Sequence, residues 1–408
     1  MDRSVRVLPA RLDRVDEVRA AVATALGGDA PLELVAPTGS AADASAPPLR
    51  VPAGTALVVR TSGSTGEPQP VALGAHALRA SAAATAARLG GGGRWLLALP
   101  LEHVAGAQVM VRSVLAGTVP VVLEPPFRPD RFVAATARLG AGRRLTSLVP
   151  TQLARLLGDP DAVAALRTFD AVLVGGAATP GPLLDALRAA GVRLVTTYGM
   201  TETCGGCVYD GVPLDGVRVR VDDDGRVLLT GDVLASGHVG RPDLDDEAFV
   251  RLDGERWLRT RDRGSWAGGR LAVHGRLDDV LVTGGEKVAP AAVEDVLASV
   301  PGVTESCVVG VPDDEWGQAV VAVVVPGAAE PDEDALRAAV RERLGRAAVP
   351  RRVVLVDALP LRPSGKVDRT AAARLAARAA AAPVPSSSPG GSTRNPTADP
   401  TPTDGSPT

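Results

Sequence analysis

Short apolar runs alternate with longer Ala/Leu/Arg-rich stretches over about the first 200 residues. The short runs predict strands over 56–60, 95–99, 120–123, 145–149, 171–174 and 193–197. The stretches between them predict helices over 76–89, 105–115, 129–139, 151–157 and 180–190. Strand–helix alternation of this kind predicts an α/β domain with a largely parallel sheet. Such sheets bind ligands beyond the carboxyl ends of their strands.

The pattern changes twice further along the chain. Short strands separated by DDDG, LDGE and AGGR predict a β-rich subdomain over 216–277. A small α+β pattern follows, with helices over 290–300, 332–344 and from 368, and strands over 306–311, 319–325 and 352–356. We therefore predict a large N-terminal domain, 1–277, and a small C-terminal domain, 278–382. Residues 383–408 are rich in Pro, Ser, Thr and Gly, and we predict a disordered tail there.

Composition excludes several classes of protein. The chain has 408 residues, 45% of them hydrophobic, and a formal charge of −3, which is typical of a soluble globular protein of two or three domains. It has no basic excess and only 2% aromatic residues, which argues against nucleic-acid binding. Neither a signal-peptide core nor an apolar run long enough to cross a bilayer is present, so we predict a cytoplasmic protein without a membrane partner. A homo-oligomer remains open.

Three cysteines, an odd number, do not predict a disulfide framework. Cys204 and Cys207 form a C-x-x-C, but a zinc site would need two more ligands at suitable spacing, and the sequence offers none. Two small residues lining a pocket wall are the favoured interpretation.

Only two lysines occur in the whole chain, Lys287 in GGEK and Lys366 in PSGK. The depletion itself is typical of a GC-rich genome. A position that keeps lysine where arginine was available favours a compact ammonium on a flexible stem. Both lysines are therefore candidate functional residues, although a solvated loop lysine is the alternative for Lys287.

One Gly-rich stretch, TSGSTGEP (61–68), follows the predicted strand 56–60. Its glycines allow backbone N–H groups to face an anion, and its hydroxyls add donors. The stretch is not a Walker loop, since G-x-x-x-x-G-K-[ST] is absent. We interpret it as a phosphate loop, with an ordinary Ser/Gly turn as the alternative.

Two more polar stretches follow predicted strands. TYGMTET (197–203) offers an aromatic face at Tyr198, a hydroxyl at Thr201 and a hard oxygen ligand for Mg²⁺ at Glu202. A strand-to-helix cap at Thr201 or Thr203 is the alternative. Gly-Gly-Ala (175–177) allows close backbone approach by a flat ligand.

Seven motifs in order resemble the adenylate-forming superfamily of acyl-CoA synthetases, adenylation domains and luciferases. They are the phosphate loop, the adenine loop GGA (175–177), the adenylate motif TYGMTE, TRDRG (260–264), the hinge motif GRLDD (275–279), the thioester loop GGEKV (284–288) and the catalytic-lysine loop PSGKVDR (363–369). The resemblance covers about residues 50–382. Within the superfamily the chain resembles the o-succinylbenzoate–CoA ligases of menaquinone biosynthesis, through CGGCVYDGVPLDGV (204–217), the segment 139–157 and a short front end.

This resemblance implies an AMP-forming acid–thiol ligase that uses ATP, Mg²⁺ and CoA. The substrate carboxylate would attack ATP to form an acyl-adenylate and pyrophosphate, and the CoA thiol would then displace AMP. The implied substrate is a small aromatic dicarboxylate, 2-succinylbenzoate. Another aryl- or acyl-CoA ligase, a carrier-protein-loading adenylation enzyme and a non-catalytic homologue are the alternatives.

The resemblance also assigns roles to residues. Lys366, Thr201, Glu202 and His103 would be catalytic, with Glu202 as the Mg²⁺ ligand and Lys366 between the substrate carboxylate and the α-phosphate. ATP and AMP would be held by Thr61, Ser62, Gly63, Ser64, Thr65, Gly66, Gly175, Gly176, Ala177, Thr197, Tyr198, Gly199, Met200, Asp262 and Arg276. The hinge and the thioester step would use Asp278, Gly284, Gly285 and Lys287.

Two positions depart from the family pattern, and the residues that bind the ring carboxylate remain open. Glu102 precedes His103 where relatives carry an aromatic residue, so we expect the carboxylate to point away from an anionic substrate; a structural histidine is the alternative for His103. Gln69 replaces a lysine common after the phosphate loop, and an arginine elsewhere or Mg²⁺ would have to compensate. Candidate donors for the ring carboxylate are Arg112, Arg143, Arg144, Thr146 and Ser147.

Overall fold

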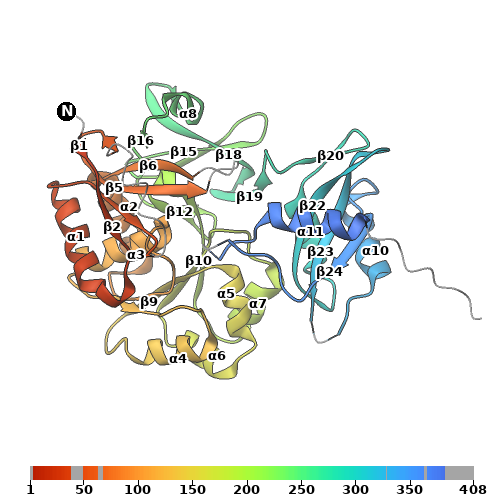
Figure 1. The fold of residues 1–408 in the computed structure, drawn as a ribbon, viewed down its shortest axis with the longest axis horizontal. Helices are drawn as coiled ribbons and strands as arrows, with labels where there is room; N and C mark the ends of the chain where they lie inside the picture. The colour runs from red at the N-terminus through yellow and green to blue at the C-terminus, as the bar shows by residue number, and fades with distance from the viewer. Residues whose placement is uncertain (1–2, 38–48, 63–67, 328, 363–364, 382–408) are drawn as a thin grey trace, which may run out of the picture.

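The structure is a computed structural model, and it describes residues 3–37, 49–62, 68–327, 329–362 and 365–381 (Figure 1). Several predicted features lie outside these residues. They are Gly63, Ser64, Thr65 and Gly66 of the phosphate loop, residues 363–364 of the catalytic-lysine loop, and the tail 383–408. Among the described helices, none is long and apolar enough to cross a membrane.

A seven-stranded sheet forms the centre of the N-terminal part. Its strand order is β13 (Val212–Pro213), β12 (Gly205–Tyr209), β11 (Leu194–Met200), β10 (Ala171–Val174), β9 (Arg144–Leu148), β7 (Arg94–Leu97) and β8 (Val121–Val122). The strands from β8 to β11 are parallel, whereas β12 and β13 are antiparallel. The prediction of a largely parallel sheet is therefore confirmed for five of the six predicted strands.

The remaining predicted strand belongs to a second sheet, ordered β16 (Gly237–His238), β6 (Pro68–Gly74), β5 (Thr55–Ser62), β3 (Leu32–Val35) and β2 (Arg6–Pro9). Here β2, β3 and β5 are parallel, but β5 and β6 form an antiparallel pair. The phosphate loop thus joins two antiparallel strands and does not lead from a strand into a helix. Two short strands, β1 (Arg3–Ser4) and β4 (Arg50–Val51), pair separately.

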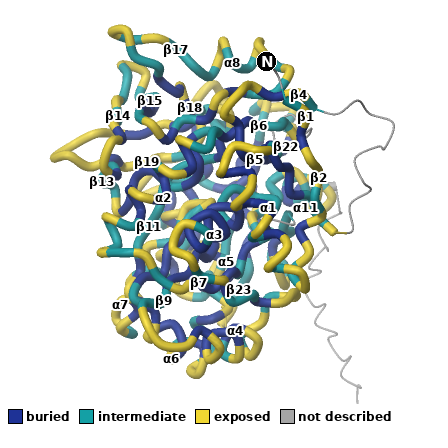
Figure 2. The backbone as a smooth tube through the Cα atoms, turned by 90° about the vertical axis from the view of Figure 1, so that its left-hand side faces the viewer, coloured by how far each residue is buried: buried dark blue, intermediate teal, exposed yellow. Residues whose placement is uncertain are grey.

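Helices cover both faces of the seven-stranded sheet. Successive side chains of a strand point to opposite faces, so each strand contributes to both of the resulting cores. Trp95 and Leu97 of β7 point into the same core as α1 (Val15–Gly27), α2 (Ala75–Leu89) and α3 (Val104–Leu115), which pack between the two sheets. Leu96, between them, points to the opposite core. That core is closed by α4 (Pro129–Ala137), α5 (Pro150–Leu157), α6 (Pro160–Arg167) and α7 (Gly181–Ala189). Figure 2 shows the buried strands enclosed by more exposed helices.

The predicted β-rich subdomain is an antiparallel sheet. Its order is β14 (Arg218–Val221), β15 (Arg226–Thr230), β18 (Glu255–Ala267) and β17 (Phe249–Leu252), with β19 (Arg270–Arg276) paired to β18 and the short helix α8 (Pro242–Ala248) beside it. The last residue of β19 is Arg276 of the hinge motif.

The C-terminal part has a core of its own (Figure 1). It contains the hairpin β20 (Leu281–Thr283) and β21 (Glu286–Val288), and a sheet ordered β22 (Val303–Asp313), β23 (Gly317–Pro326), β24 (Arg352–Leu355). Helices α9 (Pro290–Leu297) and α10 (Glu333–Leu344) cover one face of this sheet, and α11 (Arg369–Ala381) covers the other. All six elements predicted for this part are present, with boundaries shifted by at most three residues.

The sequence prediction missed several elements, among them α1, α6, α8, β2, β3, β6 and β12. The buried positions of α1 are Val18, Ala21, Val22, Ala25 and Leu26, which follow the i, i+3, i+4 spacing of an amphipathic helix. The pattern was therefore present in the sequence of this helix and was overlooked.

Candidate active site

The adenylate motif is not a loop after β11 but the end of the strand itself. β11 continues through Met200, and a 3-10 turn, Thr201–Thr203, follows. The strand is extended because β12 folds back on it, pairing Met200 with Gly205 and Thr197 with Tyr209. Gly199 permits this close return, since a Cβ there would lie 2.2 Å from the carbonyl oxygen of Gly205.

Thr203, one of the two residues considered as a cap, holds the turn together. Its Oγ1 accepts a hydrogen bond from the N–H of Met200 at 2.9 Å. Thr203 is fully buried, whereas Thr201 retains slight exposure at 8%. The side chain of Thr201 is therefore the one of the two with access to a ligand.

Cys204 and Cys207 are free thiols buried in the core beside this turn. Burial raises the pKa of both thiols, that of Cys207 to about 12. The carbonyl of Cys204 accepts hydrogen bonds from Ser81 Oγ at 3.1 Å and Gln108 Nε2 at 2.6 Å. The described residues contain no group of three or more His, Cys, Asp or Glu that could hold a metal ion.

Glu202 lies against a histidine that the sequence analysis did not select. His238 Nε2 is 3.5 Å from Glu202 Oε1, and His238 Nδ1 is 2.7 Å from Asp245 Oδ1. The His238 side chain is 8% exposed and that of Glu202 18%. The contact with Glu202, followed by that with Asp245, raises the pKa of His238 despite its burial. The sequence spacing of Glu202, His238 and Asp245 did not predict that they meet. His238 lies on β16, and β16 reaches Glu202 through its pairing with β6.

Lys366 reaches this site from the C-terminal part. A Cβ added to Gly176 in the adenine loop would lie 3.1 Å from Lys366 Cε and 3.8 Å from its Nζ, so the side chain passes directly over that glycine. Burial, with the nearby Arg362 and Arg276, lowers the pKa of Lys366, and Glu202 acts in the opposite direction. In Figure 1 the chain entering α11 crosses from the C-terminal part toward β10.

His103 belongs to the same neighbourhood. It is the residue before α3, and its N–H donates to the carbonyl of Pro100 at 3.3 Å. Burial lowers the pKa of His103; Glu102 raises it, and Lys366 lowers it further. Lys366, Glu202 and His103, predicted from three separate motifs, therefore interact in one region.

Tyr198 and Asp262 are bonded directly. The Tyr198 hydroxyl donates to Asp262 Oδ2 at 2.7 Å, and Arg276 Nη1 lies 3.9 Å from Asp262 Oδ1. Burial raises the pKa of Asp262, partly offset by Tyr198 and Arg276. Thr197, one residue before, requires Gly175 beside it, because a Cβ at Gly175 would lie 2.2 Å from Thr197 Oγ1.

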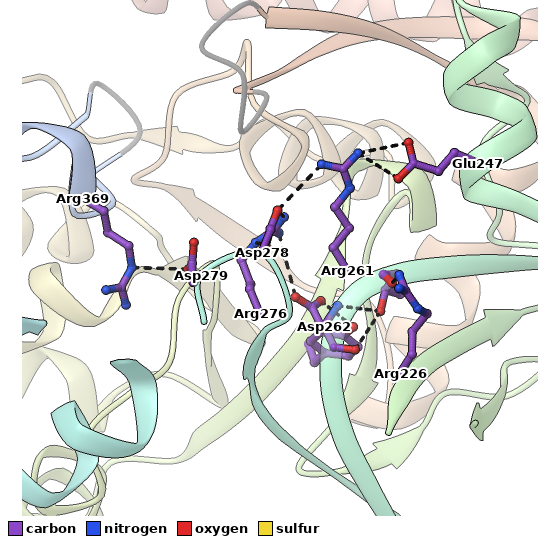
Figure 3. Close-up of polar contacts among 10 residues, drawn as sticks. Arg226, Glu247, Arg261, Asp262, Arg276, Asp278, Asp279 and Arg369 are labelled. Carbon is purple, nitrogen blue, oxygen red and sulfur yellow. Dashed lines mark hydrogen bonds and ion pairs between the residues drawn. The ribbon is translucent and has the colours of Figure 1, made fainter. Parts of the chain in front are cut away.

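A chain of charges leads from Asp262 through the hinge motif into the C-terminal part (Figure 3). Arg276 donates to both carboxylate oxygens of Asp278, at 2.8 and 2.7 Å, and Arg261 is 3.8 Å from Asp278. Burial is the largest single effect and acts to raise the pKa of Asp278, but the hydrogen bond and the charge of Arg276, together with a backbone hydrogen bond and the charge of Arg261, hold that pKa below its usual value. Arg369 Nε is 3.6 Å from Asp279.

The thioester loop lies away from this region. Gly284 and Gly285 form the β20–β21 turn with positive φ angles of 56° and 82°, and Lys287 is exposed on β21. β20 lies at the top of the C-terminal part in Figure 1, whereas Lys366 lies against Gly176, two residues after β10. Of the two lysines, the structure thus brings Lys366 to the predicted site and leaves Lys287 outside it.

The described edge of the phosphate loop has an arginine beside it. Thr61 Oγ1 donates to the carbonyl of Gln69 at 3.3 Å, and Arg241 Nη1 donates to Gln69 Oε1 at 3.3 Å. Ser62 ends β5. Arg241 also binds Asp243, at 2.8 Å through Nε. An arginine side chain therefore contacts Gln69, the residue that stands where the family resemblance implies a lysine.

Among the candidate donors for a ring carboxylate, Arg112 differs from the others. It is 8% exposed, its Nη2 donates to Thr85 Oγ1 at 3.1 Å, and its guanidinium lies 5.1 Å from the Trp95 ring centroid. Its Nε, like that of Arg143, has no hydrogen-bond partner, so the property that sets Arg112 apart from the other two arginines is its burial.

Of the other candidates, the two arginines are each bonded to a backbone carbonyl, and Thr146 and Ser147 lie in β9. Arg143 donates to the Leu89 carbonyl and Arg144 to the Gly140 carbonyl. Thr146 Oγ1 donates to the carbonyl of Leu96 at 3.0 Å. Ser147 is buried in β9. Both arginines precede or begin β9, at the edge of the sheet opposite to the adenylate motif.

Two family models match the chain. One, AMP-binding enzyme, matches residues 4–276, and the other, AMP-binding enzyme C-terminal domain, matches residues 292–366. The first match begins well before residue 50, so the resemblance extends further toward the N-terminus than the sequence motifs indicated.

Two of the curated relatives are named as ligases that join 2-succinylbenzoate to CoA. The probable 2-succinylbenzoate–CoA ligase of Mycobacterium tuberculosis is 50% identical over 326 residues, which are 78% of this chain and 84% of that protein. The 2-succinylbenzoate–CoA ligase of Geobacillus kaustophilus is 35% identical over 347 residues, covering 78% and 69%.

Solved structures show the same fold. The o-succinylbenzoate CoA synthetase of Bacillus subtilis, in complex with its acyl-adenylate intermediate, has a TM-score of 0.72 at 26% identity, covering 90% of this chain and 87% of that one. An amide bond synthetase from Marinactinospora thermotolerans has a TM-score of 0.71 at 30% identity, covering 91% and 80%.

Proposed function

The chain belongs to the AMP-binding enzyme family, and we propose that it is a 2-succinylbenzoate–CoA ligase of menaquinone biosynthesis. It converts 2-succinylbenzoate, ATP and CoA to 2-succinylbenzoyl-CoA, AMP and pyrophosphate. The observation that carries the proposal is the 50% identity over 84% of the Mycobacterium tuberculosis relative. The convergence of Lys366, Glu202 and His103 supports the chemistry. Because its substrates ATP and CoA are cytoplasmic metabolites, we place the enzyme in the cytoplasm.

In the first step, the succinyl carboxylate attacks the α-phosphorus of ATP. Two anions must approach each other, so the main task of the protein is to position them and to neutralise charge. Lys366 supplies an ammonium over the adenine loop, and its flexible stem lets it contact both the carboxylate and the α-phosphate. Thr201 contacts the α-phosphate, and Asp262 accepts hydrogen bonds from the ribose. Tyr198 holds Asp262 in place and flanks the adenine with residues 175–177.

Glu202 suits a Mg²⁺ ion that is also bound by the nucleotide. Mg²⁺ keeps several waters and takes only one or two protein carboxylates, so a single partly exposed carboxylate next to a phosphate-binding region is a sufficient protein ligand. When bound, the ion neutralises phosphate charge. The protein's part is to hold the Glu202 carboxylate in one orientation, and the described contact that does so is with His238.

Replacing His238 by alanine is expected to weaken binding of the divalent ion about tenfold, because partners that orient a metal ligand contribute on this scale. Mn²⁺ binding in the presence of a non-hydrolysable ATP analogue, followed by electron paramagnetic resonance, measures this without turnover. His76→Ala is the matched control, since His76 is an exposed histidine paired at 3.5 Å with Asp232. Equal Mn²⁺ affinity in both variants would exclude this role for His238.

The ring carboxylate of the substrate is assigned to Arg112. A buried guanidinium without a counter-ion favours an anion beside it. Gln108, one helical turn before Arg112 on α3, likewise has an unpaired Oε1, and its side chain lies against Gly205 beside the adenylate motif. Gln108 and Arg112, on one face of α3, therefore each have a buried polar atom that is not paired with any described residue.

Arg112→Met is expected to lower kcat/KM for 2-succinylbenzoate about 100-fold, the scale of a lost hydrogen bond to a charged group. For 3-benzoylpropanoate, which lacks the ring carboxylate, kcat/KM should change little. Comparing the two acids cancels any general loss of stability. Arg143→Met serves as the control arginine. A parallel loss with both acids would show that Arg112 is structural.

In the second step, the CoA thiol attacks the acyl carbonyl of the adenylate and AMP leaves. Lys287, Gly284 and Gly285 take part only after the C-terminal domain, 278–382, has rotated about Asp278. The exposed position of Lys287, away from Lys366, supports two arrangements rather than one.

Pyrophosphate release tests the function directly. ATP and Mg²⁺ are incubated with 2-succinylbenzoate, benzoate, a fatty acid or no acid, and CoA is then added. Release with 2-succinylbenzoate alone, followed by its CoA thioester, is the expected result. Release with another acid would retain the ligase mechanism and reject the substrate. No release with any acid would indicate a non-catalytic homologue and would make Gln69 the first residue to revert to lysine.

A further inference from the structure

The first turn of α5 touches the loop that carries Lys366. Thr151 Oγ1 donates a hydrogen bond to the carbonyl of Gly365 at 3.0 Å, across 214 residues of sequence. Gly365 has a φ of +78°, and a Cβ there would lie 3.2 Å from Val149 Cγ2. The peptide that joins Gly365 to Lys366 is therefore held against α5 by one directed hydrogen bond and one close packing contact.

Arg362 is hydrogen-bonded to both Gly365 and Lys366, so a constraint on Gly365 is also a constraint on Lys366. The N–H of Arg362 donates to the Lys366 carbonyl and the N–H of Gly365 to the Arg362 carbonyl, both at 2.8 Å. Leu361 and Val367, on either side of these residues, form a β-bridge. A shift of the Gly365 carbonyl would thus move the backbone from which the Lys366 side chain extends.

On the other side of this contact, α5 is fixed firmly in the N-terminal part. Gln152 accepts from the N–H of Val149 through Oε1 and donates to the carbonyl of Ala98 through Nε2, both at 3.1 Å. Leu153 and Leu156 of α5 are fully buried. Ala98 follows β7 and leads toward His103, so α5 connects the Lys366 loop to the segment that carries the other side of the site.

A charge effect on the C-terminal part comes from the same face of α5. Arg155 is one helical turn after Thr151, and residues four apart lie on one face of a helix. Burial raises the pKa of Glu305 on β22, and the charge of Arg155 acts against this. Thr151 and Arg155 therefore both face the C-terminal part, one through a hydrogen bond and the other through charge.

We propose that Thr151 is a positioning residue for adenylation, which docks the Lys366 loop on the N-terminal domain through the Gly365 carbonyl. The inference rests on the proposed function, because it assigns the docked arrangement to the adenylate-forming step. When the C-terminal domain rotates for thioester formation, the Thr151 hydroxyl and the Gly365 carbonyl separate and both are solvated. The bond consequently stabilises one arrangement and not the other.

Thr151→Val tests this proposal, because valine keeps the shape of threonine and removes the hydroxyl. The Gly365 carbonyl would then be docked without its donor, and we expect adenylation in single turnover to be about tenfold slower. The KM for ATP should stay unchanged. Transfer of CoA to a supplied 2-succinylbenzoyl-adenylate should proceed at the wild-type rate or faster. Thr151→Ser restores the hydroxyl and should restore adenylation.

Three results of these measurements would contradict the proposed role of Thr151. Equal slowing of both half-reactions, wild-type adenylation in Thr151→Val, or failure of Thr151→Ser to rescue would overturn the proposal. Arg155→Gln, on the exposed end of the same face, provides a second variant that should slow adenylation less and in the same half-reaction. If wild-type protein itself releases no pyrophosphate with 2-succinylbenzoate, the substrate assignment fails. The Thr151 comparison is then made with the acid that does react.

Discussion

Replacing Lys366 by alanine is expected to slow adenylation on the order of 10³-fold, the scale of removing one preorganised group that stabilises transition-state charge. The ammonium lies over Gly176 and interacts with Glu202 and His103, so its loss removes a cation from the place where two anions meet. CoA transfer to supplied 2-succinylbenzoyl-adenylate should be nearly unchanged, because in the proposed mechanism the second step proceeds after the Lys366 loop has left. Pyrophosphate release and thioester formation, measured separately, give the two rates.

Lys287→Ala is the matched control for this experiment, because Lys287 is the other of the two lysines in the chain. It is exposed on β21 and should leave adenylation intact while slowing CoA transfer. The pair of variants would thus give opposite patterns. Equal loss of both half-reactions in Lys366→Ala would refute the assigned role of Lys366, and an unaffected Lys287→Ala would identify Lys287 as a solvated loop residue.

Asp278→Pro should produce the reverse of Lys366→Ala, with adenylation retained and CoA transfer slowed by about a hundredfold. Proline fixes φ and prevents the backbone rotation that the second arrangement needs. A strain of about 3 kcal/mol corresponds to roughly this factor. The measurement again uses pyrophosphate release and thioester formation from supplied adenylate.

Asp278→Ala distinguishes the effect of losing the carboxylate from the effect of restricting the backbone at this position. Alanine removes the pair with Arg276, at 2.7 and 2.8 Å, but leaves φ free. If loss of the carboxylate were responsible, both variants would slow CoA transfer alike. If the backbone is the hinge, only Asp278→Pro would do so. Normal thioester formation in Asp278→Pro would remove Asp278 from the mechanism.

The elements whose sequence has a strong local pattern were predicted well, because that pattern depends only on neighbouring residues. β10 was predicted over 171–174 and occupies Ala171–Val174, because a continuous apolar run of this length suits a strand buried on both faces. The prediction failed where pairing with a distant segment changed the outcome. β11 was expected to stop at Thr197 but continues to Met200, since β12 returns along it through Gly205 and Gly206.

The candidate site shows the same division. Motif resemblance predicted roles for Lys366, Glu202, His103 and Asp262, because each lies in a stretch whose residue types suit one chemical task. It could not identify His238, whose position against Glu202 depends on the pairing of β16 with β6. It also could not choose Arg112 among five candidates, because the burial of its guanidinium is a property of the packed core.

The sequence by itself determined the superfamily and the order of most elements, and it supplied the candidate residues for binding phosphate, ribose and a metal ion. These depend on periodicity and residue type within short segments, where each residue's neighbours are known in advance. Only the tertiary structure decided which of the two lysines lies in the site, what orients Glu202, and that Thr151 meets the Gly365 carbonyl. Such contacts join residues up to 214 positions apart. They follow from how the sheets and the two domains pack, and no local pattern carries that information.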